Sequence, residues 1–215
     1  MTRETLVHRW LTLALQSLLI VGIAAAAFQG QWLAAFITGL ILLVTLLPLM
    51  VGKKLDVFIP PEMEGLAVLF VFASLFLGEV HGYYVRFWWW DLVLHAASGL
   101  LLGILGFLLV YVLNQKPDLG LDMKPGFVAL FAFMFSLGLG ALWEIFEFWM
   151  DSTLGTTMQK SLRDTMFDLI VDALGALAIS VFGYVYLKTS EVDSFLERWI
   201  LRFIEANPRL FRTRD

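Results

Sequence analysis

The sequence predicts an all-α polytopic membrane protein, built as a bundle of six transmembrane helices with a C-terminal amphipathic helix at the membrane interface. Two features of the composition lead to this class. Hydrophobic residues make up 60% of the 215 residues, whereas charged residues make up only 16%. A soluble domain carries about 25% charged residues. The third observation is the spacing of the apolar segments, which are separated by short polar connections.

A helix that spans a bilayer needs about 20 mostly apolar residues. Six segments meet this requirement: Trp10–Phe28, Trp32–Val51, Met63–Val80, Asp91–Leu113, Gly126–Met150 and Asp164–Leu187. No polar linker or soluble insertion separates them, so we expect one transmembrane domain over residues 1–190. Pro48, near the end of the second segment, predicts a kink or a helix end at that point.

The distribution of positive charge predicts the topology. Cytoplasmic loops of membrane proteins are enriched in Lys and Arg. With six spans, both termini lie on one side of the membrane. That side then carries all 15 Lys and Arg residues except Arg86, Lys160 and Arg163. We therefore expect both termini in the cytoplasm.

The tail over residues 191–215 predicts a helix that lies on the cytoplasmic surface. Its apolar residues recur at helical spacing: Val192, Phe195, Leu196, Trp199, Ile200, Phe203 and Ile204. Charges occupy the other face, a pattern typical of helices whose basic residues approach anionic lipid heads. The alternative is that this helix packs on the protein's own loops. Membrane lipid is thus the expected partner, and the net charge of −4 gives no reason to expect nucleic acid.

Several ionisable residues stand inside these apolar segments. Residues 126–143 carry no charge, and then Glu144 and Glu147 appear three positions apart, on one helix face. The sixth segment opens with a row of aspartates four residues apart, and the fourth has Asp91 one turn before His95. Charged side chains in transmembrane segments are costly, and they usually face the bundle interior and serve a function.

Because consecutive spans run in opposite directions, these residues are expected in one layer near the non-cytoplasmic ends of the helices. So many like charges cannot all stay ionised without compensation. Either several carboxyl groups are protonated or a cation neutralises them. Carboxylates with imidazole suit zinc, manganese, iron or magnesium. The expected ligands of a divalent metal are His95, Glu144, Glu147, Asp168 and Asp172, with Asp91, Asp164, Glu79 and His81 at the periphery.

Other roles are open for the same residues. Asp91 and Asp164 can serve as helix N-caps at the interface. His95 alone can be a hydrogen-bonded core histidine. Glu144 and Glu147 can be neutral acids bonded to neighbouring helices.

Four stretches of the chain match the motifs of a known family. They are GEVHGYY at Gly78–Tyr84, WDLVLHAASGLLLG at Trp90–Gly103, ALWEIFEFWMD at Ala141–Asp151 and DTMFDLIVDALGALA at Asp164–Ala178. In these stretches the chain resembles the YjdF-like family of predicted bacterial inner-membrane proteins. More loosely it resembles VanZ-like proteins, which also combine an Asp-x-x-x-His helix, a later acidic helix and an Asp-rich helix. The resemblance implies a shared fold, a shared site and the inner membrane, but no activity.

Three functions remain as hypotheses. The first is an enzyme in which a metal-activated water acts on a lipid-linked substrate. The candidate catalytic residues are then Glu144, Glu147 and Asp168, and Arg163 would hold a substrate phosphate. The second is a proton or cation transporter or channel that uses the carboxylates as relays. The third is a non-catalytic membrane subunit of a larger complex. The inner halves of the helices lack a matching polar path, which favours the first hypothesis over the second.

Overall fold

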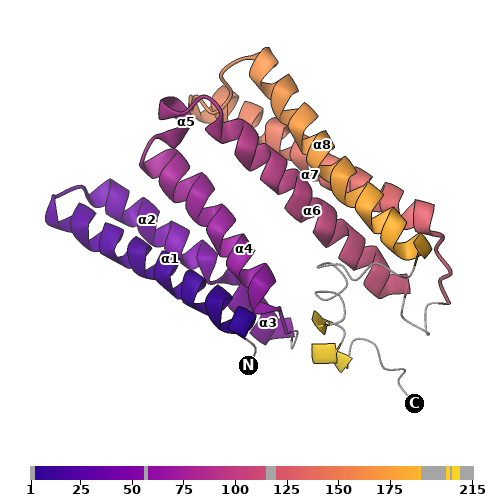
Figure 1. The fold of residues 1–215 in the computed structure, drawn as a ribbon. Helices are drawn as coiled ribbons and strands as arrows, with labels where there is room; N and C mark the ends of the chain where they lie inside the picture. Colours follow the sequence, from indigo (N-terminus) through magenta and orange to yellow (C-terminus); the bar gives the residue numbers. More distant parts are fainter. Residues whose placement is uncertain (1–2, 56–57, 115–119, 190–201, 204, 209–215) are drawn as a thin grey trace. The chain divides into compact units, whose positions relative to one another are not determined.

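The computed structural model describes residues 3–55, 58–114, 120–189, 202–203 and 205–208, and these form helices joined by short connections (Figure 1). Within the described ranges there is no strand, which confirms the all-α class. The chain separates into two compact units. The first comprises Met1–Trp90 with Glu205–Asn207, and the second comprises Asp91–Ile204 with Pro208–Asp215. The single domain expected over residues 1–190 stays a prediction.

Five of the described helices are long and apolar enough to cross a membrane. They are Leu6–Phe28, Pro61–Val80, Trp90–Asn114, Pro125–Leu154 and Leu162–Thr189. The helix Trp32–Thr45 is apolar but shorter. The chain is therefore a multi-pass helical membrane protein. The remaining expected span, Trp32–Val51, coincides with this shorter helix and the start of the helix that follows it.

The second expected span is divided in two at Leu46. Helix α2 (Trp32–Thr45) ends there, and α3 (Leu47–Leu55) follows at once. Pro48 has no amide proton to donate to Val44 O, and its ring crowds that carbonyl group. Accordingly the Leu46 amide donates to Leu43 O, one residue short of the α-helical pattern. The interruption lies where Pro48 predicted it, near the end of the segment.

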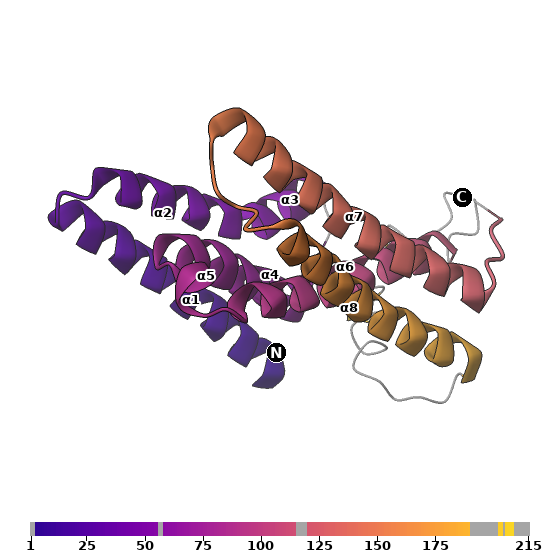
Figure 2. The same ribbon diagram turned by 90° about the horizontal axis from the view of Figure 1, so that it is seen from above.

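The first unit begins with α1 (Arg3–Phe28), which is followed by α2 and α3. It continues with α4 (Pro61–Val71), η1 (Phe72–Val80) and α5 (Tyr83–Arg86). Helices α1 and α2 form a hairpin, which Figure 2 shows from above. Gly30 has a φ of 74°, a left-handed value that permits this tight turn. Buried apolar side chains from α1, α2, α4 and η1 form the core: Leu15, Leu19, Ile41, Val68, Phe72 and Phe76.

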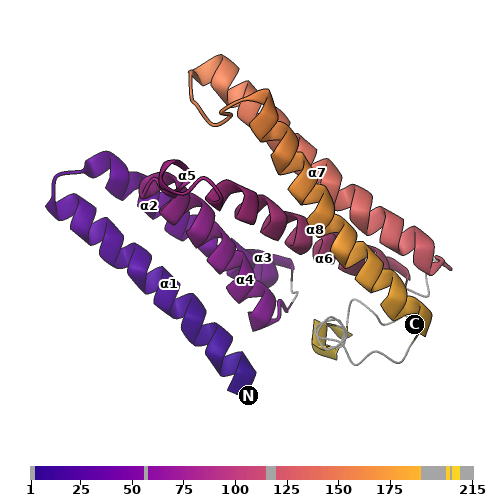
Figure 3. The same cartoon turned by 45° about the horizontal axis from the view of Figure 1, so that its top comes forward.

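The second unit holds three long helices, α6 (Trp90–Asn114), α7 (Pro125–Leu154) and α8 (Leu162–Thr189). Helices α7 and α8 lie side by side and run in opposite directions (Figures 1 and 3). Glycines allow α6 and α8 to approach closely. A Cβ atom at Gly99 would lie 2.5 Å from Asp172 O, and one at Gly175 would lie 2.6 Å from Ala96 O. Small residues at such contacts are common between membrane helices.

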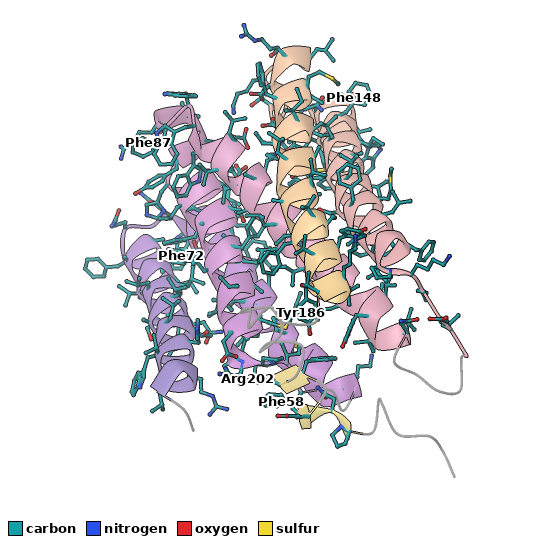
Figure 4. All side chains as sticks on the ribbon, turned by 45° about the vertical axis from the view of Figure 1, so that its right-hand side comes forward. Phe58, Phe72, Phe87, Phe148, Tyr186 and Arg202 are labelled. Atoms are coloured by element: carbon teal, nitrogen blue, oxygen red, sulfur yellow. The ribbon has the colours of Figure 1, made fainter. Side chains whose placement is uncertain are left out.

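The outer face of α7 is apolar along its length. Large hydrophobic side chains recur there at helical spacing and are exposed, among them Leu142, Ile145, Phe148 and Trp149. Phe148, which is labelled in Figure 4, stands on the outer face of the helix. A helix that exposes such a surface is suited to lipid rather than to water.

The predicted amphipathic helix of the tail lies outside the described residues, apart from a few positions. Of residues 191–215, the structure describes 202–203 and 205–208. Asn207 is buried and hydrogen-bonds the backbone of Phe58 at both polar atoms. Its Oδ1 accepts from the Phe58 amide at 2.6 Å, and its Nδ2 donates to the Phe58 carbonyl at 2.9 Å.

Candidate metal centre

The buried ionisable side chains of the second unit gather at one end of its three helices. This end is formed by the start of α6, the last turns of α7 and the first turns of α8. His95, Glu144, Asp168 and Asp172 are 7%, 4%, 3% and 1% exposed. Four ionisable groups so deeply buried are unusual, because Asp, Glu and His are rarely enclosed without partners.

Asp172 orients the imidazole ring of His95. Its Oδ2 lies 3.1 Å from His95 Nδ1, and its Oδ1 lies 2.7 Å from Ser98 Oγ. A carboxylate oxygen accepts here, so Nδ1 carries a proton, and in the neutral ring Nε2 has the lone pair. A Cβ atom at Gly140 would lie 2.5 Å from Asp172 Oδ2, so α7 reaches this carboxylate only because it has a glycine there.

His95 Nε2 points into a group of carboxylates from all three helices. It lies 3.7 Å from Asp91 Oδ1 and 3.8 Å from Glu144 Oε1. Asp91, His95 and Asp168 each offer one ligand atom, and these atoms lie within 4.8 Å of one another. We call Asp91, His95, Glu144 and Asp168 the carboxylate–imidazole cluster.

Two oxygen atoms of this cluster have no hydrogen-bond partner among the described residues. They are Glu144 Oε1 and Asp168 Oδ1, and both are buried. A buried polar atom is nearly always satisfied by protein or ordered water, and leaving one unsatisfied costs about 1–3 kcal/mol. Both atoms belong to acids from different helices that meet at the same place.

The connector between α7 and α8 is held by Asp151. Its Oδ1 accepts hydrogen bonds from Thr156 Oγ1 at 2.6 Å and from the Met158 amide at 2.8 Å. Its Oδ2 accepts from the Gln159 amide at 2.9 Å. Gln159 Nε2 in turn lies 3.2 Å from Glu144 Oε2 and 3.1 Å from the Glu144 carbonyl oxygen. One carboxylate thus fixes the loop that orients the buried glutamate.

Lys160, from the same connector, carries a positive charge to the cluster. Its Nζ lies 2.7 Å from Asp91 Oδ2 and 3.8 Å from Asp164 Oδ2, and its side chain is 44% exposed. Burial disfavours the charged ammonium group, but the hydrogen bond to Asp91 and the nearby carboxylates outweigh it. The pKa of Lys160 therefore lies above its ordinary value of 10.5, and the group is charged at neutral pH.

The remaining predicted residues lie apart from the cluster or at its edge. Asp164 is linked to the cluster by its ion pair with Lys160. The Asp164 amide donates to Ser161 Oγ at 3.2 Å, so Ser161 rather than Asp164 caps α8. Glu147 is partly buried, and its Oε1 accepts from Trp143 Nε1 at 2.9 Å. Arg163 is exposed and covers the ring of Phe167.

Glu79 and His81 belong to the first unit and are described within it. Glu79 lies in η1, and His81 Nδ1 lies 3.0 Å from Phe76 O. Their peripheral role at the site stays a prediction, as does a substrate role for Arg163.

Sequence reasoning missed three residues of the site: Ser98, Gln159 and Lys160. Ser98 follows His95 by three positions, so helical spacing placed it on a face near that of His95. Lys160 stands four positions before Asp164, a spacing that could have indicated an ion pair. Nothing in the sequence pointed to Gln159, because its place depends on the path of an irregular loop.

The fold and this end of the second unit define a class: a multi-pass α-helical membrane protein with a buried Asp/Glu/His cluster between three of its helices. The chain belongs to the family of predicted membrane proteins designated DUF2238, whose model matches residues 7–189. The matched range includes every residue of the cluster. This membership agrees with the resemblance to YjdF-like proteins.

A relative from Thermotoga maritima, described as an uncharacterized protein, is 34% identical over 115 residues. The match covers 53% of this chain and 57% of that relative, so the chain spans little more than half of the relative's length. No solved structure matches the chain.

Proposed function

We propose that this membrane protein binds a divalent cation in the carboxylate–imidazole cluster. The observation that carries the proposal is the convergence of Asp91, His95 and Asp168, whose ligand atoms lie within 4.8 Å of one another. Acidic groups alone would not suffice, because acids cluster without ions in many proteins. What distinguishes this cluster is that two of its buried oxygen atoms, Glu144 Oε1 and Asp168 Oδ1, have no hydrogen-bond partner among the residues that the structure describes. A cation held by Asp91, His95 and Asp168 would be a partner for Asp168, and Glu144 Oε1, 3.8 Å from His95 Nε2, would lie near it.

The charges of the site support the same proposal. Five carboxyl groups meet there: Asp91, Glu144, Asp164, Asp168 and Asp172. Among the described residues, only Lys160 and a protonated His95 approach them as cations. Carboxylates this close in a low-dielectric setting repel one another strongly. A divalent ion would offset two of the negative charges.

The donor set favours manganese, iron(II) or zinc. Imidazole with carboxylates suits these ions, whereas magnesium prefers oxygen ligands and retains several waters. Ligands bound at about 2.0–2.2 Å lie at most about 4.4 Å apart, so the cluster would close by a few tenths of an ångström on binding. Asp172 would serve as the support of a liganding histidine, since such histidines commonly donate their second ring N–H to a carboxylate.

We extend the proposal to the location of the site and to the chemistry of a bound cation. The bias in Lys and Arg supports a topology with both termini in the cytoplasm. The resemblance to YjdF-like proteins supports the bacterial inner membrane, and together they support a site towards the periplasm. A cation bound there would supply a Lewis acid and an activated water. A carboxylate of the site that the cation leaves free would be placed to take the proton of that water. Hydrolysis of a lipid-linked substrate is the reaction this arrangement supports.

The test is the metal content and stability of the purified protein in detergent. We expect the wild type to retain manganese, iron or zinc after dialysis, and its thermal unfolding temperature to rise when the metal is added, because a ligand of the folded state stabilises it. His95→Ala and Asp168→Asn should lose both effects. His8→Ala is the matched control, since His8 lies in α1 of the other unit. A wild type that retains no metal and is indifferent to manganese, iron, zinc, magnesium and chelator would refute the proposal.

A further inference from the structure

Lys160 forms an ion pair with Asp91, one of the proposed cation ligands, and cation binding alone does not explain this ion pair. We infer that Lys160 determines which cations enter the site, acting as a tethered ammonium ion that monovalent cations cannot displace and divalent cations can. The inference rests on the proposed function. It makes Lys160 a specificity-determining residue, although it ligates nothing itself.

The ammonium group occupies a ligand of the proposed cation. Lys160 Nζ lies 2.7 Å from Asp91 Oδ2, while the other oxygen of the same carboxylate, Oδ1, lies 3.7 Å from His95 Nε2. Asp91 therefore lies between the imidazole and the lysine. A cation that takes the full charge of Asp91 must weaken or replace the ion pair with Lys160.

The backbone of the connector holds Lys160 in place for this role. The Lys160 amide approaches Asp164 Oδ2 at 3.3 Å, and the preceding amide, that of Gln159, donates to Asp151 Oδ2 at 2.9 Å. The side chain of Gln159 is bound to Glu144. Hydrogen bonds of the connector thus hold the backbone of Lys160 close to the cluster.

A tethered competitor acts at a high local concentration. Groups joined by a short linker meet at effective concentrations in the millimolar range or above. Sodium or potassium carries the same charge as the ammonium group, so neither gains Coulomb energy by replacing it. A divalent ion interacts with each carboxylate about twice as strongly at the same distance. A divalent ion at the cluster would also lie near the oxygens of Glu144 and Asp168 that have no hydrogen-bond partner in the described part of the chain and that Lys160 leaves unsatisfied.

The experiment is titration calorimetry of manganese binding to the full chain in detergent. Each protein is measured in tetramethylammonium chloride and in potassium chloride at equal ionic strength, so that electrostatic screening is the same in both salts. Potassium is small enough to enter the site, whereas tetramethylammonium is not. Wild type should bind manganese equally well in the two salts.

Lys160→Met should bind manganese at least about fivefold more tightly in tetramethylammonium, the lower end of typical coupling between competing groups. Potassium should then weaken its binding towards the wild-type value. Lys160→Arg, which keeps the charge, should behave like the wild type. Arg163→Met is the charge-matched control, because Arg163 covers the ring of Phe167 and pairs with no carboxylate among the described residues. It should change the affinity by less than Lys160→Met and should not create sensitivity to potassium.

Three outcomes would overturn the inference. If Lys160→Met binds manganese equally well or more weakly, Lys160 orients Asp91 and does not compete. If it binds more tightly but ignores potassium, the lysine sets the affinity and not the selectivity. If potassium already weakens binding to the wild type, the tethered ammonium does not exclude monovalent ions. Wild type and variants that all fail to bind manganese, iron or zinc would instead refute the proposed function itself.

Discussion

Replacing Gly140 by alanine tests whether helix packing and the site depend on the same contact. A Cβ atom at Gly140 would lie 2.5 Å from Asp172 Oδ2 and 3.0 Å from Asp172 Cγ, whereas ordinary contact begins at 3.4 Å. Asp172 cannot easily give way, because Ser98 and His95 hold its two oxygens. Either α7 and α8 move apart or Asp172 leaves Nδ1 of His95.

The magnitude follows from comparing this clash with helix propensity. Alanine is better than glycine inside a helix by about 0.8–1 kcal/mol. Overpacking a close contact costs about 1–3 kcal/mol. Gly138, two residues earlier on the same helix, is exposed, and its Cβ would meet nothing within 4 Å. Gly138→Ala should therefore be neutral or stabilising. Because both sites are in α7, the difference between the variants isolates the clash, and Gly140→Ala should be less stable by about 1–3 kcal/mol.

The assays are thermal unfolding in detergent with chelator, and calorimetric titration with manganese. Gly140→Ala should unfold at a lower temperature than Gly138→Ala, and it should bind the cation about 10- to 100-fold more weakly, the usual effect of disturbing the support of a liganding histidine. Equal stability and equal affinity in the two glycine variants would refute the reasoning, because Asp172 would then not be confined between α7 and His95.

Three further predictions concern the same site and the topology. Glu144→Gln keeps the shape of the side chain but removes its charge, so it should weaken metal binding and shrink the rise in unfolding temperature on adding metal; in chelator it should be as stable as the wild type or more stable, since repulsion is relieved, and an undiminished response to metal would argue against Glu144 as a ligand. Asp172→Leu removes the acceptor of the His95 Nδ1 proton and should weaken manganese binding by about 10- to 100-fold; Asp172→Asn, whose amide can turn its oxygen to Nδ1 and its nitrogen to Ser98, should lose less, and the reverse order would contradict the orienting role of Asp172. A reporter fused after Asp215 should be active only in the cytoplasm, as the Lys and Arg bias predicts; activity in the periplasm would reverse the side assigned to the site.

Much of the fold follows from the sequence because lipid imposes a simple rule. Every backbone polar group in the membrane must be bonded within its own segment, so a long apolar run is a helix. The limits of the last three expected spans agree with α6, α7 and α8 to within a few residues. The interruption at Leu46 was also foreseeable from Pro48. The π-helical geometry of η1 was not, because it reflects wider backbone pairing and not side-chain periodicity.

The site was only partly foreseeable. Helical spacing brings Asp168 and Asp172 to one face, and both are buried. Spacing cannot say which of them meets which atom of His95. Asp91, expected at the periphery, stands beside Nε2, whereas Asp172 supports Nδ1 from the other side. Lys160 and Gln159 depend on the loop that Asp151 organises, and no periodic pattern encodes the path of such a loop.

The bond between His95 and Asp172 also sets an order of events during biosynthesis. The two residues are 77 positions apart. At about 5–20 residues per second, the ribosome needs about 4–15 s to make the chain between them. Helix α6 can therefore enter the membrane well before its aspartate partner on α8 exists. The imidazole acquires its fixed orientation only when the last long helix inserts beside the earlier ones. A cation captured by the complete cluster would thus mark molecules whose synthesis and insertion are nearly finished.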